Sequence, residues 1–234
     1  MIVKVCGLRV AQNIREVSAL DVDWIGLVFW KDSPRYVTQI SSRGGFIPDY
    51  TSIDTEMPKL GGKPIFGNQE NKPKRVGVFV DDMPQNIVTR VANFKLDFVQ
   101  LHGEESPVMI QNLRSTLEPD IRKNVKIIKT ISVASADDFA KCKPYVGLVD
   151  YFLFHNQCEQ KGGSGEKFDW NLLDAYDLDV PFLVSGGIGP DDVEVVKAIK
   201  HTQFAGIDIN SKFETEVAVK DAERIKAFVE ALRA

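Results

Sequence analysis

Residues 181–199 read PFLVSGGIGPDDVEVVKAI, and this stretch contains the repeating unit that decides the fold. It opens with a short, continuously apolar run, which is typical of a strand buried on both faces of a parallel sheet. A glycine-rich loop follows, and Pro190 then stands where proline fits the first turn of a helix. The stretch therefore predicts a strand, a loop and a helix in that order.

The same unit recurs along the chain. Strands are expected at 2–6, 24–29, 75–80, 98–101, 126–130, 148–154, 181–184 and 204–207. Helices are expected at 11–20, 84–94, 107–117, 134–142, 170–176, 191–199 and 221–232. This alternation predicts an α/β fold, a single (β/α)8 TIM barrel over residues 1–234, with a doubly wound open sheet as the alternative. The first strand is not followed by Gly-x-Gly-x-x-Gly, which weakens a dinucleotide-binding interpretation.

The composition narrows the class of protein further. Of 234 residues, 44% are apolar and 26% charged, as in a folded globular protein. A net charge of -4 and a pI of about 5.5 argue against a nucleic-acid partner. The sequence contains no apolar run near the roughly 20 residues of a membrane helix and no signal-peptide pattern at its N-terminus. Three cysteines at irregular spacing suggest neither a disulfide framework nor a metal site. We expect a cytoplasmic protein without a membrane partner.

One segment breaks the alternation. Residues 41–73 are rich in glycine and proline and show little helical periodicity. The sequence predicts that this segment is an irregular, flexible insert after the second strand, which leaves the second helix short, irregular or displaced. It is either a tolerated surface excursion or a lid over the site.

Chemically useful side chains fall at the expected carboxyl ends of strands, where barrel enzymes carry their active sites. Cys6 ends the first strand, Arg35 follows the second, His102 follows the fourth and Asp208 follows the eighth. Each has a plain structural interpretation as well: a small buried hydrophobe, a solvated loop charge, a hydrogen-bonded imidazole and a loop cap. Their shared position favours a common site.

The loops after the last two strands indicate an anion site. Glycines expose backbone N–H groups, and barrels often bind phosphate with the loops after strands seven and eight. The residues concerned are Gly186, Gly187, Asn210 and Ser211. Taken alone, the glycine pair would be an ordinary turn.

These residues belong to a set of ordered motifs that resembles the phosphoribosylanthranilate isomerase family, which acts in tryptophan biosynthesis. The resemblance covers nearly the whole chain. It rests on Lys4-Val5-Cys6-Gly7, Ser33-Pro34-Arg35-Tyr36-Val37, Arg75-Val76-Gly77-Val78-Phe79-Val80, Val99-Gln100-Leu101-His102-Gly103, Gly162-Gly163-Ser164-Gly165 with Phe168-Asp169-Trp170, Ser185-Gly186-Gly187, and Asp208 with Ser211.

The resemblance implies an Amadori rearrangement of N-(5′-phosphoribosyl)anthranilate, a small phosphosugar, without metal or organic cofactor. Cys6 would be the general base, acting as a thiolate, which requires its pKa to fall below the reference of about 8.5. Arg35 would clamp the anthranilate carboxylate, Gln100 and His102 would line the pocket, and Asp208 would bond the substrate. The amides that would hold the phosphate are those of Gly186, Gly187, Asn210 and Ser211.

The sequence departs from the family at the general acid. The family has an Asp-Thr-Lys run at the end of strand six, and here the run is His155-Asn156-Gln157. Imidazolium, with a reference pKa near 6.5, can donate a proton near neutrality, but its size and reach differ from those of a carboxylic acid. Three outcomes stay open: an impaired isomerase, an inactive phosphosugar-binding barrel, or a barrel re-purposed for another reaction. The sequence leaves the choice between monomer and homodimer open as well.

Overall fold

Parallel strands close into a barrel in the computed structural model of the chain. The structure describes residues 1–42, 45–48, 73–118, 120–156 and 169–234, and of 39–42 and 45–48 it describes the backbone only. The barrel strands are β1 (Ile2–Val5), β2 (Trp24–Val28), β5 (Lys74–Phe79), β6 (Phe98–Leu101), β7 (Lys126–Val133), β8 (Tyr151–Asn156), β9 (Phe182–Ser185) and β10 (Phe204–Ile209). Their order around the closed barrel is β1-β10-β9-β8-β7-β6-β5-β2. The predicted (β/α)8 barrel is therefore confirmed, and the open sheet is excluded.

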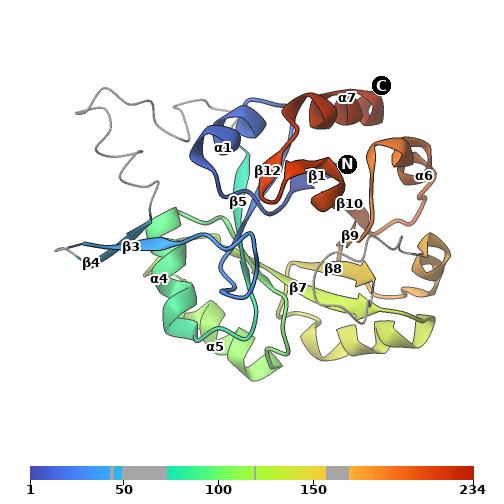
Figure 1. Ribbon diagram of the computed structural model, residues 1–234. Coiled ribbons are helices and arrows are strands. Elements are labelled where there is room, and N and C mark those ends of the chain that lie inside the picture. The colour runs from blue at the N-terminus through green and yellow to red at the C-terminus, as the bar shows by residue number, and fades with distance from the viewer. Residues whose placement is uncertain (43–44, 49–72, 119, 157–168) are drawn as a thin grey trace.

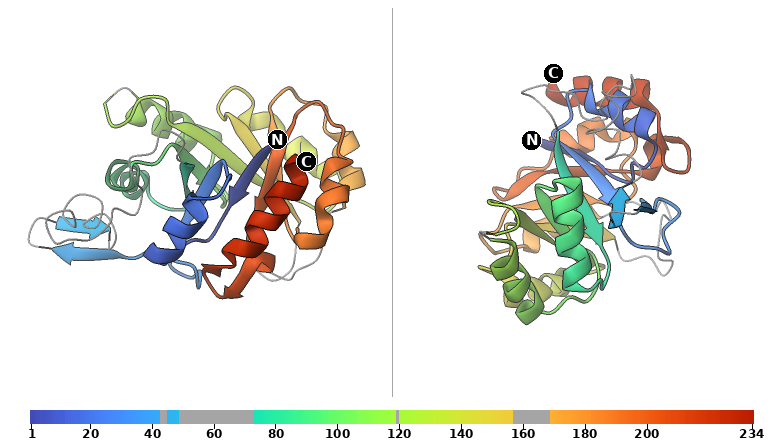
Figure 2. Two further views of the ribbon diagram at one scale, coloured as in Figure 1. Left: turned by 90° about the horizontal axis from the view of Figure 1, so that it is seen from above. Right: turned by 90° about the vertical axis from the view of Figure 1, so that its left-hand side faces the viewer.

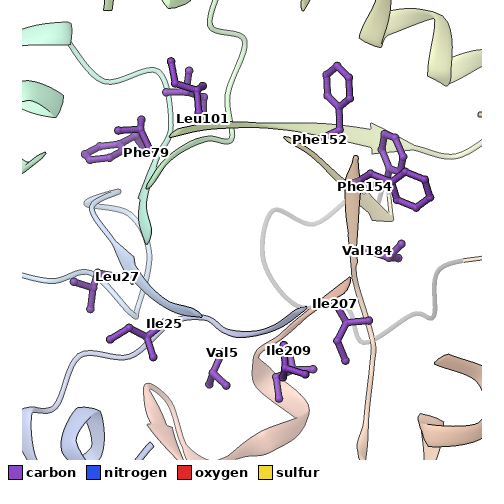
Figure 3. Packing of buried hydrophobic residues seen from close by; sticks show 14 of the residues in the cluster. Val5, Ile25, Leu27, Phe79, Leu101, Phe152, Phe154, Val184, Ile207 and Ile209 are labelled. Carbon is purple, nitrogen blue, oxygen red and sulfur yellow. The ribbon is translucent and has the colours of Figure 1, made fainter. Parts of the chain in front are cut away.

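Alternation along the strands sorts side chains into two environments. One set points away from the barrel axis and packs under the surrounding helices, as Figure 3 shows for Val5, Leu27, Phe154 and Ile207. The other set fills the barrel interior. At the amino ends of the strands this interior holds an apolar cluster that includes Trp24. Strands buried on both faces explain why the sequence runs are continuously apolar rather than alternating.

Helices surround the barrel (Figure 1). The α-helices are α1 (Ala11–Ser18), α4 (Pro84–Phe94), α5 (Pro107–Leu117), α6 (Val193–Lys197) and α7 (Ala222–Arg233). Prolines open α4 and α5, as the sequence predicts, and the Asp221 side chain caps α7 by accepting from the Arg224 amide at 3.0 Å. Helices α1 and α7 lie side by side, and the two chain ends lie near each other (Figure 2).

Three expected α-helices differ from the prediction. Residues 134–142 and 170–176 form 3-10 segments instead, η1 (Ala136–Tyr145) and η2 (Trp170–Ala175). In η1, Pro144 lacks the amide hydrogen that a continued α-helix needs. The expected helix 191–199 is a 3-10 turn, η3 (Pro190–Asp192), followed by the five residues of α6. Hydrophobic periodicity located these segments but did not distinguish the two helix types.

The expected insert at 41–73 begins with a feature that the sequence did not indicate. β3 (Gln39–Ser42) and β4 (Gly45–Pro48) pair as an antiparallel hairpin. The hairpin extends away from the barrel beside α4 (Figures 1 and 2). The remainder of the predicted flexible insert, residues 49–72, lies outside the described residues, as does any displaced second helix. None of the helices that the structure describes is both long enough and apolar enough to cross a membrane.

Candidate active site

Cys6 lies at the carboxyl end of β1, where its amide donates to the Ile209 carbonyl of β10 at 2.9 Å. The side chain is 6% exposed. Two residues earlier on the same inward face, the fully buried Lys4 donates to Asp208 Oδ2 at 2.8 Å. Lys4 and Asp208 are register partners across β1 and β10. The first and last strands thus place a thiol, an ammonium and a carboxylate together inside the barrel.

The charges of this group act on each other. Burial raises the pKa of the Cys6 thiol, and the Lys4 ammonium opposes this only in part. Burial by itself would lower the pKa of Lys4, but the charges of Asp208 and Cys6 raise it. Despite this neighbouring cation, the pKa of Cys6 lies above its ordinary value, whereas the thiolate role requires it to lie below. Removing a thiol from water penalises the thiolate more than one paired ammonium compensates.

His155 lies on β8 and not just after it, because the strand runs two residues beyond the predicted end at 154. Its ring lies edge-on to that of His102, with centroids 5.6 Å apart. A Cβ built on Gly186, whose φ is +111°, would come within 3.6 Å of His155 Nδ1. His155 is therefore adjacent to the glycine loop after β9.

Burial shifts both imidazoles toward the neutral form. The pKa of His155 is lowered by burial, with Asp208 opposing the shift. The pKa of His102 falls to about 3, chiefly by burial and further by the positive charge that His155 and Lys4 can carry. Taking an imidazolium out of water costs more than taking out a neutral ring.

Three strands of the barrel, β6, β8 and β10, each carry a buried polar side-chain atom without a hydrogen-bond partner among the described residues. Gln100 on β6 donates to Thr130 Oγ1 at 3.2 Å, but its Oε1 atom has no partner. Of the five buried side-chain N and O atoms that lack a hydrogen bond within the described part of the chain, three are Gln100 Oε1, His155 Nδ1 and Asp208 Oδ1. A buried polar atom left unpaired costs free energy. All three belong to predicted site residues, and this indicates a polar ligand.

Arg35 is brought to the same end of the barrel, but not as a free clamp. A Cβ on Gly7, whose φ is +78°, would come within 2.5 Å of Arg35 Cδ, so the side chain lies across the backbone next to Cys6. Its Nε and Nη2 donate to Glu214 at 2.8 and 2.6 Å. Hydrogen bonding to Glu214 raises the pKa of Arg35. The sequence prediction of a solvated or ligand-clamping arginine missed this partner.

The loops expected to bind phosphate follow β9 and β10. Gly186 and Gly187 have φ of +111° and +68°, a backbone that favours glycine. Ser211 opens the 3-10 turn η4 (Ser211–Phe213), and Asn210 Oδ1 accepts from Lys220 at 2.6 Å. The start of the expected helix after the glycines offers fewer free amides to an anion than predicted. The Gly189 amide already donates to Asp192 Oδ2 at 2.7 Å. The loop 162–165 lies outside the described residues.

Three residues of this site were missed by sequence reasoning: Lys4, Glu214 and Lys220. Lys4 carried a usable signal, since a lysine two residues before Cys6 in a strand must share its inward face. Glu214 and Lys220 lie on a hairpin after the last barrel strand, β11 (Glu214–Glu216) and β12 (Val219–Lys220), which no sequence pattern indicated. Across the described residues, no three or more His, Cys, Asp or Glu side chains group to hold a metal ion.

A closed parallel barrel with a buried thiol, imidazoles and a carboxylate at its carboxyl end defines a (β/α)8 barrel enzyme with a site for proton transfer. Comparison with known proteins identifies the family. The sequence profile described as N-(5'phosphoribosyl)anthranilate (PRA) isomerase matches residues 65–231. The chain belongs to this family. The family, the relatives and the fold support the PRA isomerase reaction of tryptophan biosynthesis as its function.

Relatives and solved structures agree. The N-(5'-phosphoribosyl)anthranilate isomerase of Parabacteroides distasonis is 40% identical over 98% of this chain and 92% of the relative. The N-(5'-phosphoribosyl)anthranilate isomerase of Phocaeicola vulgatus is 36% identical over 100% of this chain and 98% of the relative. The fold is similar to phosphoribosyl anthranilate isomerase from Thermus thermophilus, with a TM-score of 0.73 at 21% identity over 100% and 98%. It is also similar to an isomerase in complex with reduced 1-(o-carboxyphenylamino)-1-deoxyribulose 5-phosphate, with a TM-score of 0.71 at 23% identity over 100% and 99%.

Proposed function

We propose that Cys6 is the general base and that His155 occupies the general-acid position of this isomerase. A proton delivered to the ribose ring oxygen opens the ring to a Schiff base, and removal of the C2′ proton then gives the enolamine that rearranges to the ketose. The observation that carries the proposal is the set of unpartnered polar atoms on Gln100, His155 and Asp208 around the end of β1. A substrate with ring and hydroxyl oxygens would satisfy them.

The other site residues are assigned to the carboxylate, the sugar and the phosphate of the substrate. Arg35 binds the anthranilate carboxylate, Gln100 and His102 line the pocket, and Asp208 bonds the sugar. The amides that hold the phosphate belong to Gly186, Gly187, Asn210 and Ser211. The positive φ of the two glycines supports this assignment, because such backbone turns its N–H groups toward an anion.

Burial acts in opposite directions on the two kinds of general acid, and this is why His155 impairs the enzyme. An uncharged carboxyl group is the proton donor, so burial drives an aspartic acid toward the form that catalysis needs. An uncharged imidazole has already lost its acidic proton, so the same burial drives His155 toward the inactive form, and its lowered pKa has this direction. Together with the raised pKa of Cys6, this leaves few molecules with a protonated acid and a thiolate base at neutral pH.

The same shift supports a second candidate function. A barrel that retains its carboxylate and phosphate contacts but lacks a working acid would bind phosphoribosyl ligands without turning them over, or would be re-purposed. The retention of Cys6 together with Arg35 favours the isomerase, because a binding protein needs no base.

We also propose a cytoplasmic location and a monomeric or homodimeric state. The cysteines Cys6 and Cys142 are free and buried, and a thiol that must act as a base is preserved in a reducing compartment. Among the solved structures with a similar fold are monomers generated from the dimeric phosphoribosylanthranilate isomerase of Thermotoga maritima. The partners of this enzyme are then its phosphosugar substrate and, at most, a second copy of the chain, with no nucleic acid or membrane partner.

The test is the loss of anthranilate fluorescence with freshly generated substrate between about pH 5.5 and 8.5. Turnover needs a protonated His155 and a Cys6 thiolate at once, and these two populations change in opposite directions with pH, so residual turnover should be nearly flat above the pKa of His155 and fall below it. His155→Asp should raise kcat by about 10²-fold. His155→Asn is the matched control, since it removes the titrating ring, and any turnover left should rise with pH as the Cys6 thiolate forms. Equal kcat in all three proteins would show that another group is the acid. No turnover with tight binding of the reduced product would establish the binding barrel.

A further inference from the structure

A continuous chain of hydrogen bonds joins the two expected ends of the substrate. Arg35 donates twice to Glu214, and Lys220 Nζ donates to Glu214 Oε1 at 2.5 Å. The same Lys220 ammonium donates to Asn210 Oδ1 at 2.6 Å. Glu214 and Lys220 therefore connect the residue assigned to the carboxylate with a residue assigned to the phosphate.

The connecting pair is buried although it lies on a short hairpin. The side chains of Glu214 and Lys220 are 7% and 0% exposed. Asn13 of α1 fixes the backbone of Lys220 from both sides, with its Nδ2 donating to the carbonyl and its Oδ1 accepting from the amide, each at 2.7 Å. Buried ion pairs contribute little to net stability because desolvation offsets the attraction. Such a rigid arrangement is better explained by a need for precise placement.

The net charge of this group of side chains also favours a role in ligand binding. One carboxylate lies between two cations, so Arg35, Glu214 and Lys220 together have a net charge of +1. An anionic ligand complements this excess. Burial lowers the pKa of Lys220 while Glu214 opposes the shift, so the ammonium depends on its carboxylate partner.

Glu214 also decides which edge of Arg35 is free. It occupies Nε and Nη2, and no acceptor within the described parts of the chain bonds Nη1. The guanidinium is a rigid planar fork, so fixing one edge fixes the direction of the other. Because the Arg35 side chain also lies across Gly7, it has little freedom to turn.

We infer that Glu214 and Lys220 are positioning residues, which set the direction of Arg35 toward the substrate carboxylate and of Asn210 toward its phosphate. The inference rests on the proposed function, since it takes both ends of the substrate from there. Glu214 bonds Arg35 directly and reaches the phosphate end only through Lys220, whereas Lys220 itself bonds both Glu214 and Asn210.

The experiment compares two probes by calorimetry on the whole protein. One is reduced 1-(o-carboxyphenylamino)-1-deoxyribulose 5-phosphate, and the other is the same compound without the ring carboxylate. Glu214→Gln should weaken the first about tenfold and the second less than about twofold, as expected for one misdirected charge-assisted contact. Lys220→Met should weaken both. In turnover, Glu214→Gln should raise KM with little change in kcat.

Glu216→Gln is the matched control, because it removes the same charge from an exposed position of the same hairpin. It should leave both affinities unchanged. Equal losses for both probes in Glu214→Gln, or no loss for either, would overturn the inference. If that variant does not fold, Glu214→Asp keeps the charge but shortens the reach and should show the same selectivity. Failure of the unaltered protein to bind either probe would overturn the proposed function itself.

Discussion

The barrel interior contains two layers built on the same strands with opposite chemistry. At the amino ends lie Trp24, Val76, Phe98, Ile128, Leu153 and Leu183. The rings of Trp24 and Phe98 are 4.2 Å apart, and Tyr151 meets Trp24 edge-on at 5.3 Å. At the carboxyl ends the buried residues include Lys4, Gln100, Thr130 and Asp208. The layer at the amino ends, called the lower layer below, is apolar and closely packed. The layer at the carboxyl ends contains polar atoms without hydrogen-bond partners among the described residues. Stability and ligand chemistry are thus separated along the barrel axis.

Cys6→Ala should give the largest effect, a loss of turnover of at least about 10³-fold, because it removes the base proposed to take the C2′ proton. Affinity for the reduced product should stay within a few-fold, because the proposed carboxylate and phosphate contacts do not involve Cys6. The measurements are fluorescence turnover and calorimetry. Full activity in this variant would show that the base lies elsewhere.

Phe98→Ala in the lower layer should lower the free energy of unfolding by about 3 to 5 kcal/mol, because it opens a cavity beside Trp24. Urea denaturation measures this loss. At urea concentrations below the unfolding midpoint, the affinity of this variant for the reduced product should be unchanged. A selective loss of affinity in a protein of unchanged stability would contradict the separation of the two layers.

His102→Gln should make the protein less sensitive to acid. The folded pKa of His102 is about 3, below the unfolded value of about 6.5, so the unfolded chain alone gains this proton between the two values. Stability is therefore lost as the pH falls from 6.5. Because the ring is partly exposed, we expect the variant to lose about 1 kcal/mol less than the parent between pH 7 and 5. Denaturation curves at the two pH values test this, and identical losses would contradict the low pKa.

Gln100→Leu should have the smallest effect on stability, and it should not lower the free energy of unfolding as Phe98→Ala does. It removes the unpartnered Oε1 atom but also the hydrogen bond to Thr130, so the free energy of unfolding should stay constant or rise by up to about 1 kcal/mol. Turnover should fall, because a pocket contact is lost. Thermal melting with the fluorescence assay distinguishes the two effects. A clear loss of stability would mean that Gln100 serves the fold and not the ligand.

The sequence by itself determined the alternation of strands and helices, most strand positions and the cluster of site candidates, whereas closure of the sheet into a barrel was decided by the structure. Short, continuously apolar runs are typical of strands buried on both faces, and parallel strands bring the residues that follow them to one end of the sheet. This was enough to bring His102, His155 and Asp208 together from distant parts of the chain. The motifs were enough to indicate the family, because they occur in order over nearly the whole chain.

Only the tertiary structure decided which atoms have partners. The Arg35–Glu214 contact joins residues 179 positions apart, and the Lys4–Asp208 contact joins residues 204 apart, so neither follows from local pattern. The type of helix at 136–145 and the direction of each pKa shift depend on packing and burial in the same way. A sequence shows that histidine replaces an acid at position 155, but whether that imidazole is charged depends on the low-dielectric site that the folded barrel builds around it.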